Sequence, residues 1–120
     1  MVKEISAEEL EKLFQRKRIV IIEFSAKWCG PCKVLGKLLN SKVVPKIKRM
    51  EEVELVKIDI DKNLEFAKSL KVRSVPTMIF FVRGKQELIE NKNGQDDRIV
   101  GFDPNIDSVI ERFLTKKEIS

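Results

Sequence analysis

The chain has 120 residues, of which 42% are hydrophobic and 36% are charged, and its formal net charge is +5. This length suits one compact domain spanning residues 1–120. The absence of histidine excludes histidine-based acid–base catalysis and histidine-ligated metal. No apolar run approaches the ~20 residues of a membrane helix. Lysines interleaved with Glu and Asp predict a mixed-charge surface rather than a nucleic-acid patch.

The first quarter of the chain predicts an edge strand, a helix and a central strand. Residues 2–5 favour a short edge strand. Ser6 and Glu9 have capping-box spacing, in which the Ser6 side chain accepts a hydrogen bond from the Glu9 amide. Apolar residues then recur at helical spacing, which predicts a helix over 7–16. Residues 19–25, Ile-Val-Ile-Ile-Glu-Phe-Ser, are nearly all apolar and predict a strand covered on both faces.

A second helix is expected to begin at Pro31, because a proline in the first helical turn loses no hydrogen bond. The helical pattern falters near residues 40–41, and Pro45 should kink or divide the segment. Alternation over 53–60 predicts another strand, and residues 61–70 predict a short helix.

The last part of the chain predicts a hairpin and a closing helix. The predicted strands cover 78–82, 86–89 and 98–101. The polar stretch between the last two suggests an extended hairpin that turns at Asn93-Gly94. Asp103 as N-cap and Pro104 in the first turn should start the final amphipathic helix. Strands and helices that alternate first and end in a hairpin predict an α/β fold with a mixed sheet.

The chain has only two cysteines, Cys29 and Cys32. Two thiols cannot build a disulfide framework, and a tetrahedral zinc site would need two further ligands. A c-type haem site would place histidine after the second cysteine, where this chain has Lys33. A redox-active pair remains, and the alternative is two ordinary core cysteines.

The position of these cysteines at the start of a predicted helix favours redox chemistry. The unpaired amide groups and the dipole of a helix N-terminus stabilise an anion, and they lower the pKa of a thiol. We therefore expect Cys29 to be the nucleophile. Cys32 lies one turn deeper and should be the resolving thiol, which attacks the mixed disulfide.

The run Trp28-Cys29-Gly30-Pro31-Cys32-Lys33, after the strand 19–25, resembles the active site of thioredoxins, and Val75-Pro76-Thr77 resembles their cis-proline loop. The resemblance covers essentially the whole chain. It implies a thioredoxin fold, in which helices flank both faces of a central mixed sheet of four to five strands. It also implies a redox disulfide between Cys29 and Cys32.

The same resemblance implies a function, which is the reduction of disulfides in oxidised proteins without a cofactor or a metal. A thioredoxin reductase would then re-reduce the chain. A client strand would pair with the backbone of Val75, before a cis Pro76. Trp28, Gly30 and Pro31 would border the thiol, and Gly101 would leave room for the client backbone.

Glu23 stands where thioredoxins usually carry a buried aspartate, and Lys57 matches the lysine near that acid. A carboxylate among Ile, Val and Phe should be desolvated, which raises its pKa. The resemblance implies that Glu23 transfers a proton for Cys32, with Lys57 opposing the effect of burial. The alternative places Glu23 at a solvated strand edge and Lys57 on the surface.

Other features concern partners and location. Phe102 follows Gly101 where thioredoxins more often have a small residue, so client choice could differ. The competing functions are a disulfide oxidase or isomerase and a thioredoxin-like binding module of a larger assembly. Residues 1–10 lack the basic and then apolar character of a signal peptide, so we expect a cytoplasmic protein. We also expect a monomer that binds neither membrane nor nucleic acid.

Overall fold

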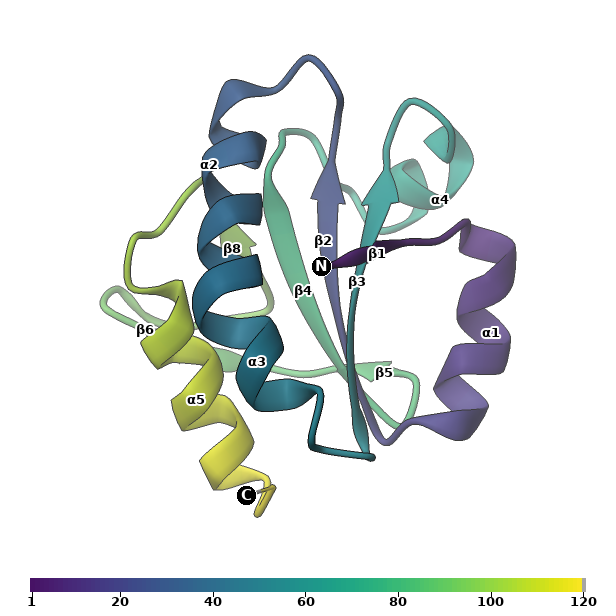
Figure 1. Cartoon of the computed structure of the whole chain (residues 1–120). Helices are drawn as coiled ribbons and strands as arrows, with labels where there is room; N and C mark the ends of the chain where they lie inside the picture. The colour runs from purple at the N-terminus through teal and green to yellow at the C-terminus, as the bar shows by residue number, and fades with distance from the viewer. Residues whose placement is uncertain (120) are drawn as a thin grey trace.

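The computed structural model describes residues 1–119 and shows a mixed sheet with helices on both faces (Figure 1). The order of the main sheet is β1-β3-β2-β4-β5, and β8 also pairs with β4. The strands are β1 (Lys3–Glu4), β2 (Ile19–Ser25), β3 (Val53–Asp59), β4 (Thr77–Val82), β5 (Lys85–Gln86) and β8 (Ile99–Val100). Because β5 and β8 pair with opposite ends of β4, they share one edge, and the sheet has five strand positions.

The sheet is parallel between β1, β3 and β2 and antiparallel between β2 and β4. The central position of β2 follows from its composition, because all seven of its residues are buried. The predicted strands over 2–5, 19–25, 53–60 and 78–82 are confirmed, with bounds that differ by at most one residue.

Two apolar clusters lie on opposite faces of the sheet, because successive side chains of a strand alternate between faces. One face is covered by α2 (Gly30–Leu38), the π-helical segment η1 (Leu39–Val43), α3 (Val44–Ile47) and α5 (Ile106–Lys116). The other face is covered by α1 (Ala7–Arg16) and α4 (Leu64–Ser69). Phe80 belongs to the first cluster, and Phe24 and Phe81 belong to the second, so these three rings are core residues.

The interruption predicted near residues 40–41 is confirmed as η1, which separates α2 from α3. Pro45 lies in the first turn of α3, where it needs no amide hydrogen. Asn40 lies in η1, and its side-chain oxygen accepts a hydrogen bond of 2.8 Å from the Val2 amide. The N-terminal residues are thereby attached to this segment.

The predicted capping box at Ser6 is wrong. Ser6 is the N-cap residue of α1, but its side chain makes no capping hydrogen bond, and the Glu9 amide donates to the Ser6 backbone carbonyl. The Ala7 amide instead donates to the side-chain oxygen of Asn63, at 2.9 Å. A residue distant in sequence has therefore taken over the capping.

Two further helix starts differ from prediction. Helix α4 begins at Leu64 instead of residue 61, because Asp61 and Asn63 form turns with Asp59. Helix α5 begins at Ile106 with Asn105 as N-cap. The Asp103 carboxylate accepts from the Asn105 amide at 2.8 Å, which is a turn rather than a helical cap.

The extended hairpin is present, but it is a separate two-stranded sheet. Strand β6 (Ile89–Asn91) pairs with β7 (Gly94–Asp96), so the turn residues are Lys92 and Asn93 rather than Asn93 and Gly94. The predicted strand 86–89 is split, since its beginning pairs with β4 and its end with β7. The buried Ile89 side chain anchors the hairpin to the core.

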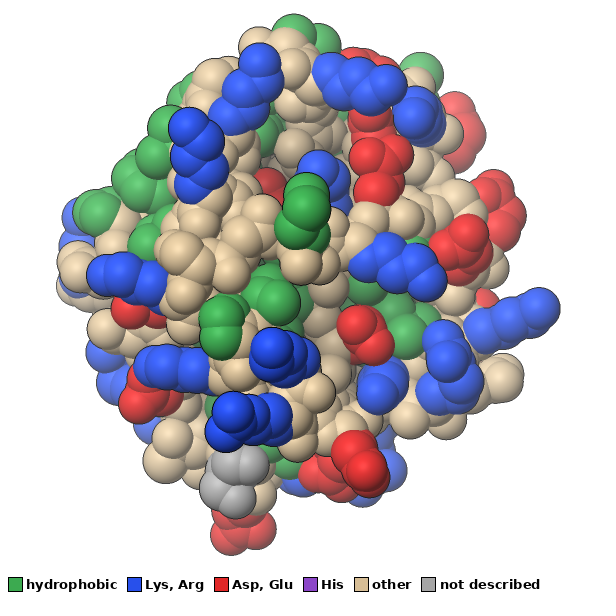
Figure 2. Space-filling view, viewed as in Figure 1, with side chains coloured by type: hydrophobic (Ala, Val, Ile, Leu, Met, Phe, Trp, Pro, Cys, Tyr) green, Lys and Arg blue, Asp and Glu red, His purple; other side chains and the backbone are tan. Residues whose placement is uncertain are grey.

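The visible face carries Lys and Arg side chains among Asp and Glu, as the sequence predicts (Figure 2). No helix within residues 1–119 is both long enough and apolar enough to span a bilayer.

Candidate active site

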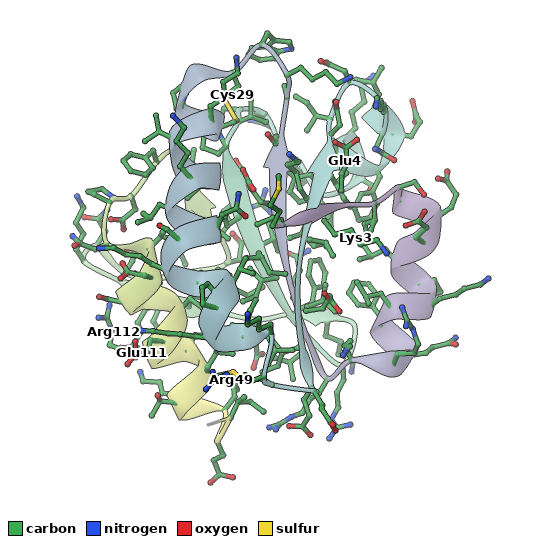
Figure 3. All side chains as sticks on the ribbon, viewed as in Figure 1. Lys3, Glu4, Cys29, Arg49, Glu111 and Arg112 are labelled. Atoms are coloured by element: carbon green, nitrogen blue, oxygen red, sulfur yellow. A yellow bond between two sulfur atoms is a disulfide. The ribbon has the colours of Figure 1, made fainter. Side chains whose placement is uncertain are left out.

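Cys29 and Cys32 lie at the N-terminus of α2, at the upper end of the helix in Figure 3, and are joined by a disulfide. Cys29 is the N-cap residue, and its sulfur accepts a hydrogen bond of 3.2 Å from the Cys32 amide. Both side chains are buried. The first turn of α2 therefore directs a backbone N–H at the Cys29 sulfur, as the sequence predicts, and this arrangement favours a thiolate when the disulfide is reduced.

A loop distant in sequence lies against this sulfur. The peptide bond between Val75 and Pro76 is cis, and the Val75 carbonyl oxygen lies 3.6 Å from Cys29 Sγ. The Gly101 amide donates to the Pro76 carbonyl at 2.8 Å. Cys29, Val75-Pro76 and Gly101, which are far apart in sequence, thus meet at one end of the sheet.

Gly101 has a φ of +86°, a conformation that side chains disfavour. A Cβ built on Gly101 or on Gly30 would meet no atom within 4 Å, so both glycines face open space beside the cysteines. A passing polypeptide could approach the backbone closely at these two positions.

Trp28 and Pro31, which adjoin the two cysteines in sequence, are exposed, and 69% of Trp28 is accessible. The Trp28 indole donates a hydrogen bond of 2.9 Å to the Asp61 carboxylate. Sequence reasoning missed Asp61. The contact arises in the fold, because β2 and β3 are parallel and the loops that follow them leave the same edge of the sheet.

Glu23 is buried in β2, with 1% of its surface exposed, so the alternative of a solvated strand edge is wrong. Among residues 1–119, neither of its carboxylate oxygens has a hydrogen-bond partner. Desolvation raises the pKa of Glu23 from 4.5 to about 7, and the positive charge of Lys57 partly opposes this rise. A carboxyl group with this pKa can both accept and release a proton near neutral pH.

Lys57 is half-buried on β3, directly opposite Glu23 in the register of the two strands. A cavity of about 360 Å³ connects these residues with the second cysteine. Its walls include Glu23, Lys57, Asp59, Cys32, Asn40 and Glu4. The buried carboxyl group and Cys32 therefore border one cavity that is open to the surface. No cluster of metal-ligating side chains occurs within residues 1–119.

Cys29 and Cys32 are bonded across one turn of a helix, and the Val75-Pro76 loop lies against the Cys29 sulfur. This arrangement defines a thiol–disulfide oxidoreductase of the Cys-x-x-Cys class. The comparisons with known proteins give the family. The sequence model of the family described as thioredoxin matches residues 1–102. The chain therefore belongs to the thioredoxin family, and Cys29 and Cys32 are its active-site pair.

Similar proteins cover most of the chain. A thioredoxin of Mycoplasmoides gallisepticum is 34% identical over 80% of this chain and 83% of its own length. A thioredoxin of Mycoplasma genitalium is 33% identical over 94% of this chain and 98% of its own length. The solved thioredoxin of Fasciola hepatica is 30% identical and superposes with a TM-score of 0.71, covering 97% of this chain and 98% of that one. The fold is the thioredoxin fold, and the chain is a thioredoxin-type protein disulfide oxidoreductase.

Proposed function

We propose that this thioredoxin reduces disulfides of oxidised proteins with Cys29 as the nucleophile and Cys32 as the resolving thiol. One observation carries this assignment, namely the hydrogen bond of 3.2 Å from the Cys32 amide to Cys29 Sγ. The same amide would stabilise a Cys29 thiolate after reduction, whereas Cys32 lies one turn deeper along the cavity that holds Glu23.

The reaction then has two exchanges. The Cys29 thiolate attacks one sulfur of the client disulfide, which forms a mixed disulfide and releases the first client thiol. Cys32 loses its proton and attacks the Cys29 sulfur, which forms the Cys29–Cys32 disulfide and releases the second client thiol. The client gains two electrons and two protons, and the dithiol of the chain is oxidised.

Glu23 is proposed to accept the proton of Cys32 in the second exchange. Its burial and its pKa of about 7 support this role, because a base works best when its pKa lies near the working pH. Lys57 is proposed to keep part of the Glu23 population ionised, so that an acceptor is available.

Client binding is proposed to use the surface around the disulfide. The backbone of Val75 would pair with an extended client segment, and Pro76 and Gly101 would shape the groove. Exposed Trp28, together with Gly30 and Pro31, would contact the client on the side of α2. The open space beside the two glycines supports this placement.

The proposed electron donor is a thioredoxin reductase, and the proposed location is the cytoplasm, where thiols are kept reduced. Residues 1–120 are proposed to form a single domain, since the two apolar clusters share one sheet as their common wall. We also propose a monomer, because all the site residues come from one chain.

Reduction of insulin disulfides in the presence of dithiothreitol tests the proposal. We expect turnover by the wild-type chain and none by Cys29→Ser. A reduction potential near ~−270 mV would support a reductant, whereas a value near ~−120 mV would indicate an oxidase and overturn the proposed direction. Turnover with a thioredoxin reductase of the same organism tests the donor.

A further inference from the structure

A row of three charged residues crosses the sheet beside the disulfide. Glu4 on β1 pairs in register with Lys57 on β3, and Lys57 pairs in register with Glu23 on β2. Register partners of neighbouring strands project from the same face of a sheet. All three residues also line the same cavity, so one ammonium group lies between two carboxylates.

The outer carboxylate has a second cation. Glu4 forms an ion pair of 3.5 Å with Lys62, and both side chains are exposed. Within residues 1–119, Lys57 forms no ion pair, so its charge is available to either neighbour. Lys3 precedes Glu4 and leaves β1 in the opposite direction, toward the other face (Figure 3).

We propose that Glu4 is a positioning residue for proton transfer, because its carboxylate draws the Lys57 ammonium away from Glu23 and so keeps Glu23 from being permanently ionised. The inference rests on the proposed proton transfer by Glu23. Without Glu4, the full charge of Lys57 would act on Glu23, whose own carboxylate oxygens have no hydrogen-bond partner among the described residues. Glu4 contacts no reacting atom and acts only through Lys57.

Other charged groups border the same cavity and also contribute to the electrostatic potential at Glu23. Strand β4 contributes only the uncharged Met78 opposite Glu23. The titratable and charged groups of the remaining walls are the Met1 amino group and Glu4 from the N-terminal segment, Lys27 from the loop before α2, Cys32, Lys33 and Lys37 from α2, and Lys57 and Asp59 from β3. Glu4 and Lys57 are the pair that shares a register row with Glu23.

The direct test is the titration midpoint of Glu23, followed by carboxyl-carbon NMR in the oxidised protein, where the cysteines do not titrate. Glu4→Gln should lower the midpoint by roughly half a pH unit or more, since it removes a negative charge and frees Lys57. Lys62→Met should raise it, since Glu4 then turns to Lys57. Glu4→Asp should restore most of the wild-type midpoint.

Two comparisons separate action through Lys57 from a general effect of net charge. In a Lys57→Met background, Glu4→Gln should shift the midpoint by less than half of its effect in the wild type. Lys3→Gln, which removes a charge on the other face, should leave the midpoint in place. An unmoved midpoint in Glu4→Gln, an undiminished shift without Lys57, or a shift in Lys3→Gln as large as that in Lys62→Met would each overturn the inference.

The pH profile of mixed-disulfide resolution distinguishes this inference from the proposed function. We expect the profile of Glu4→Gln to move to lower pH together with the midpoint. If the midpoint moves and the profile does not, Glu4 does control Glu23, but the proposed role of Glu23 in proton transfer fails.

Discussion

Glu23 and Lys57 lie directly opposite one another on neighbouring strands, yet burial outweighs the attraction between their charges. The folded chain therefore holds a proton on Glu23 up to a pH of about 7, whereas the unfolded chain releases it near 4.5. Between these values the unfolded state binds fewer protons than the folded state. The stability contributed by this site is complete at low pH and is lost as the pH rises toward 7.

Glu23→Gln should therefore stabilise the folded chain at alkaline pH. The shift corresponds to about 3 kcal/mol between roughly pH 4 and pH 8.5, because each pKa unit is worth about 1.4 kcal/mol. Urea unfolding of the oxidised wild type and variant at these two pH values measures the difference. A difference in unfolding free energy that is the same at both values would contradict the raised pKa.

The same substitution should slow the second exchange. Without a proton acceptor beside Cys32, the release of the client should slow by ~10²-fold at neutral pH, and the inflection of its rate near pH 7 should disappear. Stopped-flow measurement of mixed-disulfide resolution tests this. An unchanged profile would show that Cys32 gives its proton directly to solvent.

Substitution of the two cysteines should block different steps of the reaction. Cys29→Ser should abolish insulin reduction, because no nucleophile remains at the N-terminus of α2. Cys32→Ser should still attack the client but should accumulate the mixed disulfide, which mass spectrometry of the non-reduced sample detects. If Cys29→Ser instead accumulates the mixed disulfide, the two roles are reversed.

Phe102 should contribute to client binding, because it is 37% exposed and follows Gly101, whose amide is bonded to Pro76. Phe102→Ala should raise the KM for a protein client by ~3–10-fold, which corresponds to a loss of about 1 kcal/mol of apolar contact. Oxidation of dithiothreitol should be unchanged, since a small thiol does not need this surface.

Leu88→Ala is the matched control for Phe102→Ala. Leu88 is also an exposed apolar side chain, at 58%, but it lies between β5 and β6, away from the disulfide. Its loss should leave the KM for the protein client unchanged. Equal effects of the two variants would indicate nonspecific apolar binding rather than a groove at Phe102.

The strands and the site could be predicted from the sequence because local pattern and burial agree there. Residues 19–25 are apolar throughout and lie at the centre of the sheet. The cysteines could be placed at a helix N-terminus because Pro31 marks its first turn. The capping of α1 could not be predicted, because the acceptor for the Ala7 amide is Asn63, which folding brings from another element.

The contacts around Glu23 likewise could be predicted only in part from the sequence. Its burial follows from the apolar run around it. The pairing of β1 with β3 depends on folding, so no local pattern connects Glu4 with Lys57. Asp61 as the partner of Trp28 likewise depends on two loops that meet at one edge of the sheet. Contacts between distant segments decide these details.

Trp28 also gives the chain a built-in optical reporter. It is the single tryptophan of the sequence, which has no tyrosine, so the near-ultraviolet emission of the protein comes almost entirely from one indole. That indole directly precedes Cys29 and is hydrogen-bonded to Asp61. Oxidation, reduction and client docking can therefore each be followed by intrinsic fluorescence, without a dye attached to either thiol.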